Sequence, residues 1–528
     1  MMKKVLVSKR NISILIAIGL LVSSISLSIF IEKNSQRRVH HHIQEDIKNQ
    51  PREFDMKEDY TISDSFSTHL PLVVVDTNGE SPKSGVAWDK EKGYYVPLDI
   101  DPYVDGNITI IDNEGSVNNI KDKPTYQSDI LIRQRGNTST GFPKKQYLIK
   151  TINKDGSKNK QDVLGMGEEW EWVLNISYID KTLLRNYMAL NIAGEIMPYT
   201  PDVRYCEVVM KNGDEYTYEG VYLMMENVKQ GEDRVSISKY DNKFTKSSYL
   251  LRRDRFEEDA ILLDNYSTKS GLPVGYLEVK YPQKDEITEK NVEYITNDIN
   301  KLEECIYSND IDEFYKYRDY INVESFIDYF IINEFFANYD AGYHSTYIYK
   351  ENGSKISMGP VWDFDMCLDN DIKPQNILKI DSTAMHDAPW FRQLLKDANF
   401  TKKVIDRYNY LRKDILSEAN LIKYIDDTVS FLGPSIERDI LRWKYEGEYN
   451  TEVEKMKLVI KEHGKWLDEN IDSLYQFSEF SEKGINKGTL EKAKDFILGN
   501  DERTIATSIL SVIFVSIFIL SIIFVQRD

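Results

Sequence analysis

The chain has 528 residues, of which 41% are hydrophobic and 29% charged, and its formal net charge is −19 at pH 7. This length predicts two or three packed units at about 150 residues each. The acidic balance excludes a dedicated nucleic-acid binder, because neutralising phosphates requires a basic face. The three cysteines, Cys206, Cys305 and Cys367, are too few and too scattered for a disulfide framework or a cysteine-rich zinc site.

Both ends of the chain carry an uninterrupted hydrophobic run, at residues 12–31 and 505–525. As a helix, each run is long enough to span about 30 Å of hydrocarbon. Basic residues are more frequent before the first run than after it, which favours a cytoplasmic N-terminus. The first run could instead be a cleaved secretory signal, but it is longer than a typical signal core. The sequence therefore predicts a cell-membrane protein with two spans and residues 32–504 outside the cytoplasm.

Residues 32–70 are polar and predict a linker. They include His40, His41 and His42, which could bind a metal but are more typical of a flexible tract. Residues 71–285 are mostly strand-like, and the segment Lys211-Asn212-Gly213-Asp214 is typical of a hairpin turn. A helix over 181–196, with Asp180 as its N-cap, interrupts these strands. The predicted strands cover 108–111, 130–135, 146–151, 172–176, 207–210 and 217–225.

From residue 286 onward the pattern is mainly helical. A short hairpin over 346–350 and 355–358 interrupts it. Residues 433–504 predict a further helical extension. The predicted divisions of the chain are therefore an N-terminal segment 1–11, a span 12–31, a linker 32–70, a β-rich region 71–285, a helical region 286–432, the extension 433–504, a span 505–525 and a tail 526–528. The predicted helices cover 287–307, 323–338, 391–415 and 421–431.

The segment Gly-Pro-Val-Trp-Asp-Phe-Asp at 359–365 is the most informative stretch. It places Asp363 and Asp365 among large apolar neighbours, where carboxylates are costly unless a cation or hydrogen bonds compensate them. Hard oxygen ligands of this kind suit Mg²⁺ or Mn²⁺ beside nucleotide phosphates. The alternative interpretation is that Asp363 caps a turn and Asp365 is simply solvated.

The order of elements is that of a protein kinase. A strand carrying Lys150 is followed by a helix, a β-hairpin and a helical region whose loops carry Asp340 and Asp363. The helix 323–338 ends just before Asp340, and the hairpin 346–358 returns the chain to Asp363. We therefore expect the two carboxylates to face one cleft.

Several separated motifs lie in order over about residues 100–415. They are Ile-Arg-Gln-Arg-Gly-Asn-Thr-Ser (132–139) with Pro-Lys-Lys-Gln-Tyr-Leu-Ile-Lys (143–150), Asp-Lys-Thr-Leu-Leu-Arg-Asn (180–186), Tyr-Glu-Gly-Val-Tyr-Leu-Met-Met-Glu-Asn (218–227), Asn-Tyr-Asp (338–340) with His344 and Tyr-Ile-Tyr (347–349), and the segment 359–365. In these motifs the chain resembles the CotH-type spore-coat protein kinases. The resemblance implies an α+β, atypical protein-kinase-like bilobal fold with a β-rich N-lobe and a helical C-lobe, here flanked by N- and C-terminal transmembrane helices.

The resemblance also implies roles for acidic residues. Asp340 is the catalytic-loop residue that accepts or orients the proton of a Ser or Thr hydroxyl. Asp363 binds the Mg²⁺ or Mn²⁺ that bridges the phosphates of ATP, and Asp365 assists it.

Nucleotide contacts follow from the same resemblance. Lys150 is the phosphate-binding lysine, Arg135 lies in a turn near the phosphates, and the backbone of Glu226 and Asn227 forms the hinge that meets adenine. Lys150 can also be read as a solvent-facing strand end, and the Arg135 turn as purely structural.

Three classes of function remain. The resemblance favours a membrane-anchored, metal-dependent kinase that transfers the γ-phosphate of ATP to Ser or Thr of an envelope or spore-coat protein. The alternatives are a cell-surface glycosidase using two of the three aspartates as acid and base, and a catalytically silent surface or coat scaffold. Departures from the family pattern keep the silent scaffold open: Ser345 stands where an Asn is common, and Thr140 and Gly141 stand where a Trp is usual.

Overall fold

The computed structural model describes residues 50–51, 56–113, 116–256, 258–370, 380–445 and 447–480. All of them lie within one compact unit that extends from His40 to Ser481. Its main feature is a sheet of eight strands, joined in the order β1-β14-β12-β9-β8-β6-β3-β13. The strands are β1 Thr61–Ile62, β3 Leu72–Asp76, β6 Val104–Ile111, β8 Tyr126–Gln134, β9 Tyr147–Ile152, β12 Glu171–Asn175, β13 Val203–Asn212 and β14 Glu215–Glu226.

The sheet closes on itself because β13 also pairs with β14, so that seven of the strands form a ring. Neighbouring strands of the ring are antiparallel except β3 and β13, which are parallel. Short pairs lie outside the ring: β2 Ser67–Thr68 with β7 Asn118–Asn119, β4 Val86–Asp89 with β5 Tyr94–Pro97, and β10 Gln161–Asp162 with β11 Glu168–Glu169.

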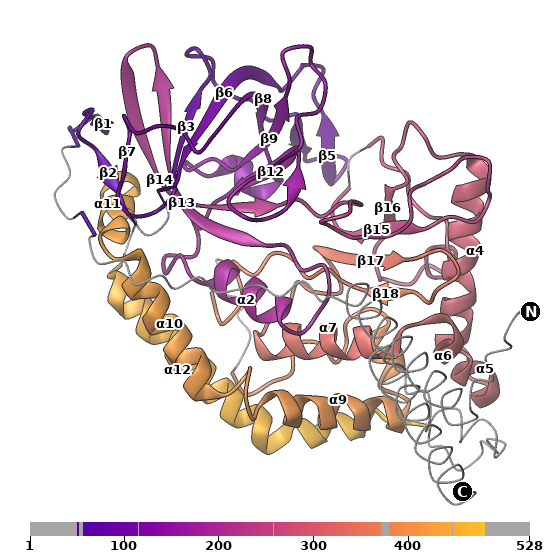
Figure 1. Cartoon of the computed structure of the whole chain (residues 1–528). Coiled ribbons are helices and arrows are strands. Elements are labelled where there is room, and N and C mark those ends of the chain that lie inside the picture. The colour runs from indigo at the N-terminus through magenta and orange to yellow at the C-terminus, as the bar shows by residue number, and fades with distance from the viewer. Residues whose placement is uncertain are drawn as a thin grey trace, which may run out of the picture. The chain divides into compact units, whose positions relative to one another are not determined.

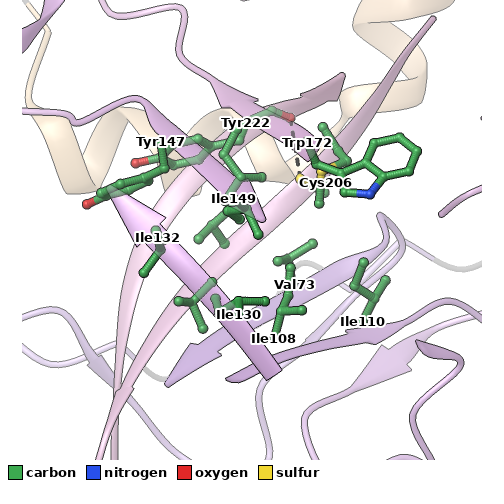
Figure 2. Packing of buried hydrophobic residues seen from close by; sticks show 14 of the residues in the cluster. Val73, Ile108, Ile110, Ile130, Ile132, Tyr147, Ile149, Trp172, Cys206 and Tyr222 are labelled. Atoms are coloured by element: carbon green, nitrogen blue, oxygen red, sulfur yellow. Dashed lines mark hydrogen bonds between the residues drawn. The ribbon is translucent and has the colours of Figure 1, made fainter. Parts of the chain in front are cut away.

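Apolar residues at alternate positions of the strands point into this ring and form its core. Ile130 and Ile132 of β8 and Ile149 of β9 are fully buried, whereas Arg133 and Lys150, one residue on, face the other side. Figure 2 shows the isoleucines gathered with residues from β3, β6, β12, β13 and β14. Burying each such side chain contributes about 1.5–3 kcal/mol, so the ring is a rigid platform for the segments outside it.

A second, antiparallel sheet has the order β16-β15-β17-β18 and packs on helix α7, Val323–Phe335. Figure 1 shows α7 below β17 and β18. The strands of this sheet are β15 Tyr249–Arg253, β16 Leu277–Tyr281, β17 Thr346–Lys350 and β18 Ser357–Met358.

The other helices of the described residues are α2 Arg185–Gly194, α3 Tyr266–Lys269, α4 Glu289–Ile306, α5 Ile311–Tyr315, α6 Tyr317–Tyr320, α8 Phe391–Leu394, α9 Ala398–Leu411, α10 Glu418–Leu432, α11 Pro434–Trp443 and α12 Tyr449–Asn470. Two 3₁₀ helices, η1 Thr138–Gly141 and η3 Ile471–Phe477, are also present.

Helix α11 joins the C-terminal helices to the closed sheet through two buried ion pairs. Arg438 donates two hydrogen bonds of 2.8 Å to the carboxylate of Glu207 on β13. Lys144, just before β9, donates to Asp439 and to the carbonyl oxygen of Val221, each at 2.7 Å. These pairs fix α11 against β14 because buried charges without partners are strongly destabilising.

Several predictions of local structure are confirmed. Each predicted strand lies within one of β6, β8, β9, β12, β13 and β14 or extends past it by a single residue. The predicted hairpin turn connects Asn212 of β13 to Glu215 of β14. Helix α7 begins where predicted, because the side chain of Asn322 accepts a hydrogen bond from the N–H of Ser325. It ends three residues early, since Ala337 adopts a φ of 50° and the Asn338 N–H bonds to the Asn333 carbonyl oxygen.

The predicted helices over 181–196 and 391–415 differ from the structure in a way that local hydrogen bonds explain. Helix α2 starts at Arg185 rather than at residue 181, because Leu183 has a φ of 63° and Asp180 accepts hydrogen bonds from the N–H groups of Thr182 and Arg185 in a preceding turn. The predicted helix 391–415 is two helices, α8 and α9. Asp397 separates them and caps α9 by accepting from the N–H of Asn399.

The structure contradicts the predicted α+β bilobal kinase-like fold class. The described residues form a mixed α/β unit whose main sheet is closed. Strands β15 and β16 fall in the predicted N-lobe, but they belong to the second sheet, in which β15 pairs with β16 on one side and with β17 of the helical region on the other. Alternation shows which face of a strand is buried but not which strands pair, so the sequence could not reveal this closure. The domain boundaries themselves stay a prediction.

The predicted membrane anchoring and cell-membrane location are also corrected. In the described part of the chain, no helix combines the length and the apolar character needed to cross a bilayer. The longest helix there is α12, which is polar over most of its surface. Residues 12–31 and 505–525, on which the prediction depended, lie outside the described residues.

Candidate functional site

The segment that follows β18 carries Asp363 in an unusual backbone conformation, with a φ of 65°. Two asparagines hold it there. Asn186 of α2 accepts a hydrogen bond of 2.7 Å from the N–H of Phe364, and Asn338 donates one of 3.4 Å to the carbonyl oxygen of Asp363. A left-handed conformation at a residue other than glycine persists only when its surroundings fix it, and such positions cluster at functional sites.

A buried arginine ties the rest of this segment to α2. Arg185 donates to the Asp180 carboxylate at 2.6 Å and to the carbonyl oxygen of Cys367 at 3.0 Å. Both charged side chains are almost fully buried. Because each satisfies the other, they form a fixed support for the turn that contains Asp365.

The structure brings Asp340, Asp363 and Asp365 together. Desolvation, followed by the negative charges of Asp340 and Asp254, raises the pKa of Asp363 to about 6. Desolvation and then the charge of Asp363 raise the pKa of Asp365 well above its ordinary value, and the two carboxyl groups hydrogen-bond each other. Because neighbouring like charges disfavour ionisation, this arrangement favours a bound proton or cation.

These carboxyl groups remain accessible from solvent. The side chain of Asp363 is exposed, and Asp340 and Asp365 are half-buried. Asp363 is therefore open to water on one side, although enough protein surrounds it to desolvate its charge. A charged ligand can therefore reach these carboxyl groups from solvent.

The loop that carries Asp340 folds back on that residue. The N–H groups of Tyr343 and His344 both donate to the Asp340 carbonyl oxygen, at 3.2 and 2.8 Å. Ser345, with a φ of 49°, donates from its hydroxyl to the Asp363 carboxylate at 3.3 Å. Ser345 is thus a direct neighbour of Asp363, at the position where the family pattern commonly has an Asn.

Arg135 also reaches this site. Its guanidinium lies 5.0 Å from the ring centroid of Trp362, next to Asp363 in the chain. Burial lowers the pKa of Arg135, and the charges of Tyr347 and Asp363 partly offset that effect. Gly136, with a φ of 99°, makes this turn, and a Cβ there would lie 2.0 Å from the Ser139 hydroxyl oxygen.

Lys150 contacts other residues than the three aspartates. Its ammonium group lies 3.9 Å from the carboxylate of Glu171 and over the rings of Tyr103 and Trp170, at 4.6 and 5.4 Å. It is half-buried on the outer face of β9. Its role as the phosphate-binding lysine stays a prediction.

The predicted hinge residues also take part in the fold itself. The buried carboxylate of Glu226 accepts from Arg234 at 2.6 Å and from the N–H of Asp202 at 2.9 Å. The Glu226 N–H donates to the Asp202 carbonyl oxygen at 3.2 Å. Asn227 follows at the end of β14 and is half-buried. Contact of their backbone with adenine stays a prediction.

Several residues of the site were missed by sequence reasoning. Asp254, directly after β15, adds a fourth carboxylate, and no motif marks it. Arg185 and Asn186 lie in a recognised motif, but nothing local indicates that they hold the segment 363–368. Their function depends on contacts between segments almost 180 residues apart.

The carboxylates fit a hard divalent cation only in part. Within the residues that the structure describes, no group of three or more His, Cys, Asp or Glu side chains is arranged to hold a metal ion. The hydrogen-bonded pair Asp363–Asp365 nevertheless offers several oxygens in a desolvated, acidic setting. Magnesium is commonly bound by one or two carboxylates, with water and substrate phosphates as its other ligands.

The order of the sequence motifs, together with Asp340, Asp363 and Asp365 in one site, is typical of kinase-like proteins, although the main sheet is closed rather than part of a bilobal fold. A family model described as CotH kinase protein matches residues 132–467. The chain belongs to this CotH kinase family. It is also similar to the inner spore coat protein H of Bacillus subtilis (strain 168), with 20% identity over 351 residues, which cover 66% of this chain and 88% of that protein.

Proposed function

We propose that this protein is a metal-dependent kinase that transfers the γ-phosphate of ATP to a Ser or Thr hydroxyl of a protein. The convergence of Asp340 with the Asp363–Asp365 pair carries this proposal. Phosphoryl transfer requires little covalent chemistry from the enzyme, so positioning and charge stabilisation supply most of the rate.

Asp340 would act on the acceptor. Its carboxylate accepts the hydroxyl proton as the acceptor oxygen bonds to the γ-phosphorus and the bond to the β,γ-bridging oxygen of ATP breaks, leaving ADP. The two loop N–H groups on the Asp340 carbonyl oxygen hold the residue for this task.

Asp363 and Asp365 would bind Mg²⁺ or Mn²⁺. When bound, the cation neutralises the phosphate oxygens and replaces the proton that the two carboxyl groups otherwise share. Asn186 and Asn338 orient the backbone around Asp363, and Arg185 supports the turn at Asp365. These contacts favour a site that is formed before the nucleotide arrives.

Arg135 would bind phosphate oxygens. Its guanidinium fork suits bidentate bonds to phosphate, and its position beside Trp362 and Asp363 puts it at the same site. In the same proposal, Lys150 exchanges its long contact with Glu171 for a phosphate, and the backbone of Glu226 and Asn227 lies near adenine.

The acceptor proposed here is a spore-coat or envelope protein, and the proposed location is the coat. The support is the name of the relative, an inner spore coat protein. The acidic character of the chain argues against a nucleic-acid partner.

The glycosidase alternative loses support at the Asp363–Asp365 pair. A glycosidase needs its two carboxyl groups about 5–9.5 Å apart. These two carboxyl groups hydrogen-bond directly, which is too close for that chemistry. A glycosidase that pairs Asp340 with one of the other two carboxyl groups and a catalytically silent scaffold stay the alternatives that the transfer experiment decides.

The test is phosphate transfer by the purified full-length protein. With γ-labelled ATP and Mg²⁺ or Mn²⁺, we expect label on the protein or on a Ser-rich acceptor. Asp363→Asn should abolish it and leave the fold intact, because the substitution also removes repulsion from Asp340. Asp406→Asn, an exposed carboxylate on α9, is the matched control and should transfer normally. Equal labelling by the Asp363 variant and the parent would overturn the metal assignment, and no labelling by the parent would favour the scaffold.

A further inference from the structure

Residues 384–388 form a support behind the loop that carries Asp340. Gly342, with a φ of 88°, sits so close to this segment that a Cβ would lie 2.8 Å from the Cβ of Ala388. The hydroxyl of Tyr343 donates to the Asp387 carbonyl oxygen at 3.0 Å. Movement of the segment would therefore move the loop, because both contacts lie within three residues of Asp340.

A single buried carboxylate holds this segment in place. Glu334, near the end of α7, accepts hydrogen bonds from the N–H of Ala384 at 2.8 and 3.0 Å and from the N–H of Met385 at 2.8 Å. Its side chain is almost fully buried. Hydrogen bonds to an ionised acceptor are roughly twice as strong as those between neutral groups, so this contact depends on the charge.

The same helix end also connects to the loop along the backbone. The Glu334 carbonyl oxygen accepts from the N–H of Ala337 at 3.0 Å, where the chain leaves α7 toward Asp340. Glu334 thus lies between the two structures that set the position of Asp340: the chain that leads into its loop and the segment that supports it.

We propose that Glu334 is a positioning residue of the transfer reaction, whose carboxylate holds residues 384–388 behind Gly342 and so keeps Asp340 in place. This inference rests on the proposed function. Glu334 itself touches neither substrate nor cation. A role in stability alone would not require a charge, because a neutral side chain of similar volume avoids the cost of burying one.

The proposal implies a pH dependence. The pKa of Glu334 is raised to about 7: desolvation is the largest cause, the N–H groups of Met385 and Ala384 oppose it, and the charge of Asp387 adds to it. Below this pKa the carboxyl gains a proton and loses part of its accepting capacity, so the hold on the segment weakens. Other titratable groups adjoin it: His386 lies in the segment, and His463 of α12 contacts the Glu334 carbonyl oxygen at 3.1 Å.

The stability of the whole fold should change with pH in the opposite sense. Because the folded state binds the Glu334 proton more tightly than the unfolded chain does, this group lowers the free energy of unfolding as pH rises from about 4.5 toward 7. As pH rises toward 7, the hold on residues 384–388 should therefore strengthen while the contribution of Glu334 to the free energy of unfolding falls, so the two effects can be measured separately.

The decisive experiment measures amide hydrogen exchange of the peptide containing Ala384 and Met385 in the full-length protein between pH 6 and 8. After correction for intrinsic rates, protection should rise about tenfold with pH in the parent, and Glu334→Gln should lose that rise. Glu324→Gln, on the same helix but paired with Lys403 at the surface, is the matched control and should behave like the parent. A rise that persists in Glu334→Gln would assign the pH dependence to His386 or His463 and overturn the proposal.

Kinetics provide the second measurement. Glu334→Gln should lower kcat about tenfold with little change in the KM for ATP, and it should flatten the pH profile of kcat between 6 and 8. A raised KM with unchanged kcat would overturn the proposal. If the parent transfers no phosphate, the proposed function fails, while the exchange measurement still decides whether Glu334 holds the segment.

A separate variant guards against misfolding of Glu334→Gln. Tyr343→Phe removes the bond to Asp387 from an exposed side chain. It should lower kcat while protection of Ala384 and Met385 stays at the parental level. Unchanged kcat in this variant would show that the segment does not position the loop.

Discussion

Asp340 precedes β17 and Asp363 follows β18, and the charge of Asp340 raises the pKa of Asp363. The hairpin returns the chain to the end of α7, so two carboxylates far apart in sequence meet. Their repulsion is offset only when a proton or a cation lies between the groups.

Replacing Asp340 should separate binding from transfer. In Asp340→Asn we expect normal affinity for ATP with Mg²⁺ and a loss of transfer of about 10²–10⁴-fold, the usual contribution of a general base. Calorimetric titration with a non-hydrolysable ATP analogue, alongside the labelling assay, measures both. A parallel loss of nucleotide affinity would instead assign Asp340 to the cation.

Cation binding should weaken in acid. Because the pKa of Asp363 is raised to about 6, protons compete with the cation below that pH. Without a cation, the raised pKa also lowers the free energy of unfolding as pH rises from 3.8 toward about 6, since the folded state binds the proton more tightly. Added Mn²⁺ should therefore raise Tm at pH 8 and have little effect at pH 5. An equal shift at both pH values, or the same shift in Asp363→Asn, would contradict this prediction.

Arg185 should be a major determinant of stability. Arg185→Met leaves Asp180 buried without its cation and removes the bond to Cys367, so we expect a loss of about 3–5 kcal/mol in unfolding free energy. Urea denaturation measures it. The double variant Arg185→Met with Asp180→Asn should recover part of the loss, because no uncompensated charge remains. No recovery would mean that packing of the guanidinium, rather than its charge, holds the turn.

The KM for ATP should depend on the shape of the Arg135 side chain as well as on its charge. Arg135→Lys loses the planar fork and the stacking on Trp362, so we expect the KM for ATP to rise about tenfold, equivalent to about 1.4 kcal/mol. Arg255→Lys, in the loop after Asp254, is the matched control. Steady-state kinetics at saturating acceptor would show the difference, and an unchanged KM would support the purely structural interpretation of the Arg135 turn.

Much of the local structure was predictable because its causes are local. The Asn-Gly hairpin between β13 and β14 and the Asn322 cap of α7 depend on hydrogen bonds within a few residues. Alternation of isoleucines on β8 and β9 likewise predicted strands. The early stop of α7 was not predictable from propensity, since it follows from a left-handed Ala337 that the surrounding packing holds.

By itself, the sequence determined where the strands and helices form, the family and the acidic residues worth testing, since side-chain pattern, turn chemistry and motif order are encoded along the chain. Only the tertiary structure decided that β13 closes the main sheet, that Lys150 contacts Glu171, and that Asp254 joins Asp340 and Asp363. The physical reason is that desolvation and repulsion depend on distances through space. Those distances are set by packing between segments that have no local interaction to connect them.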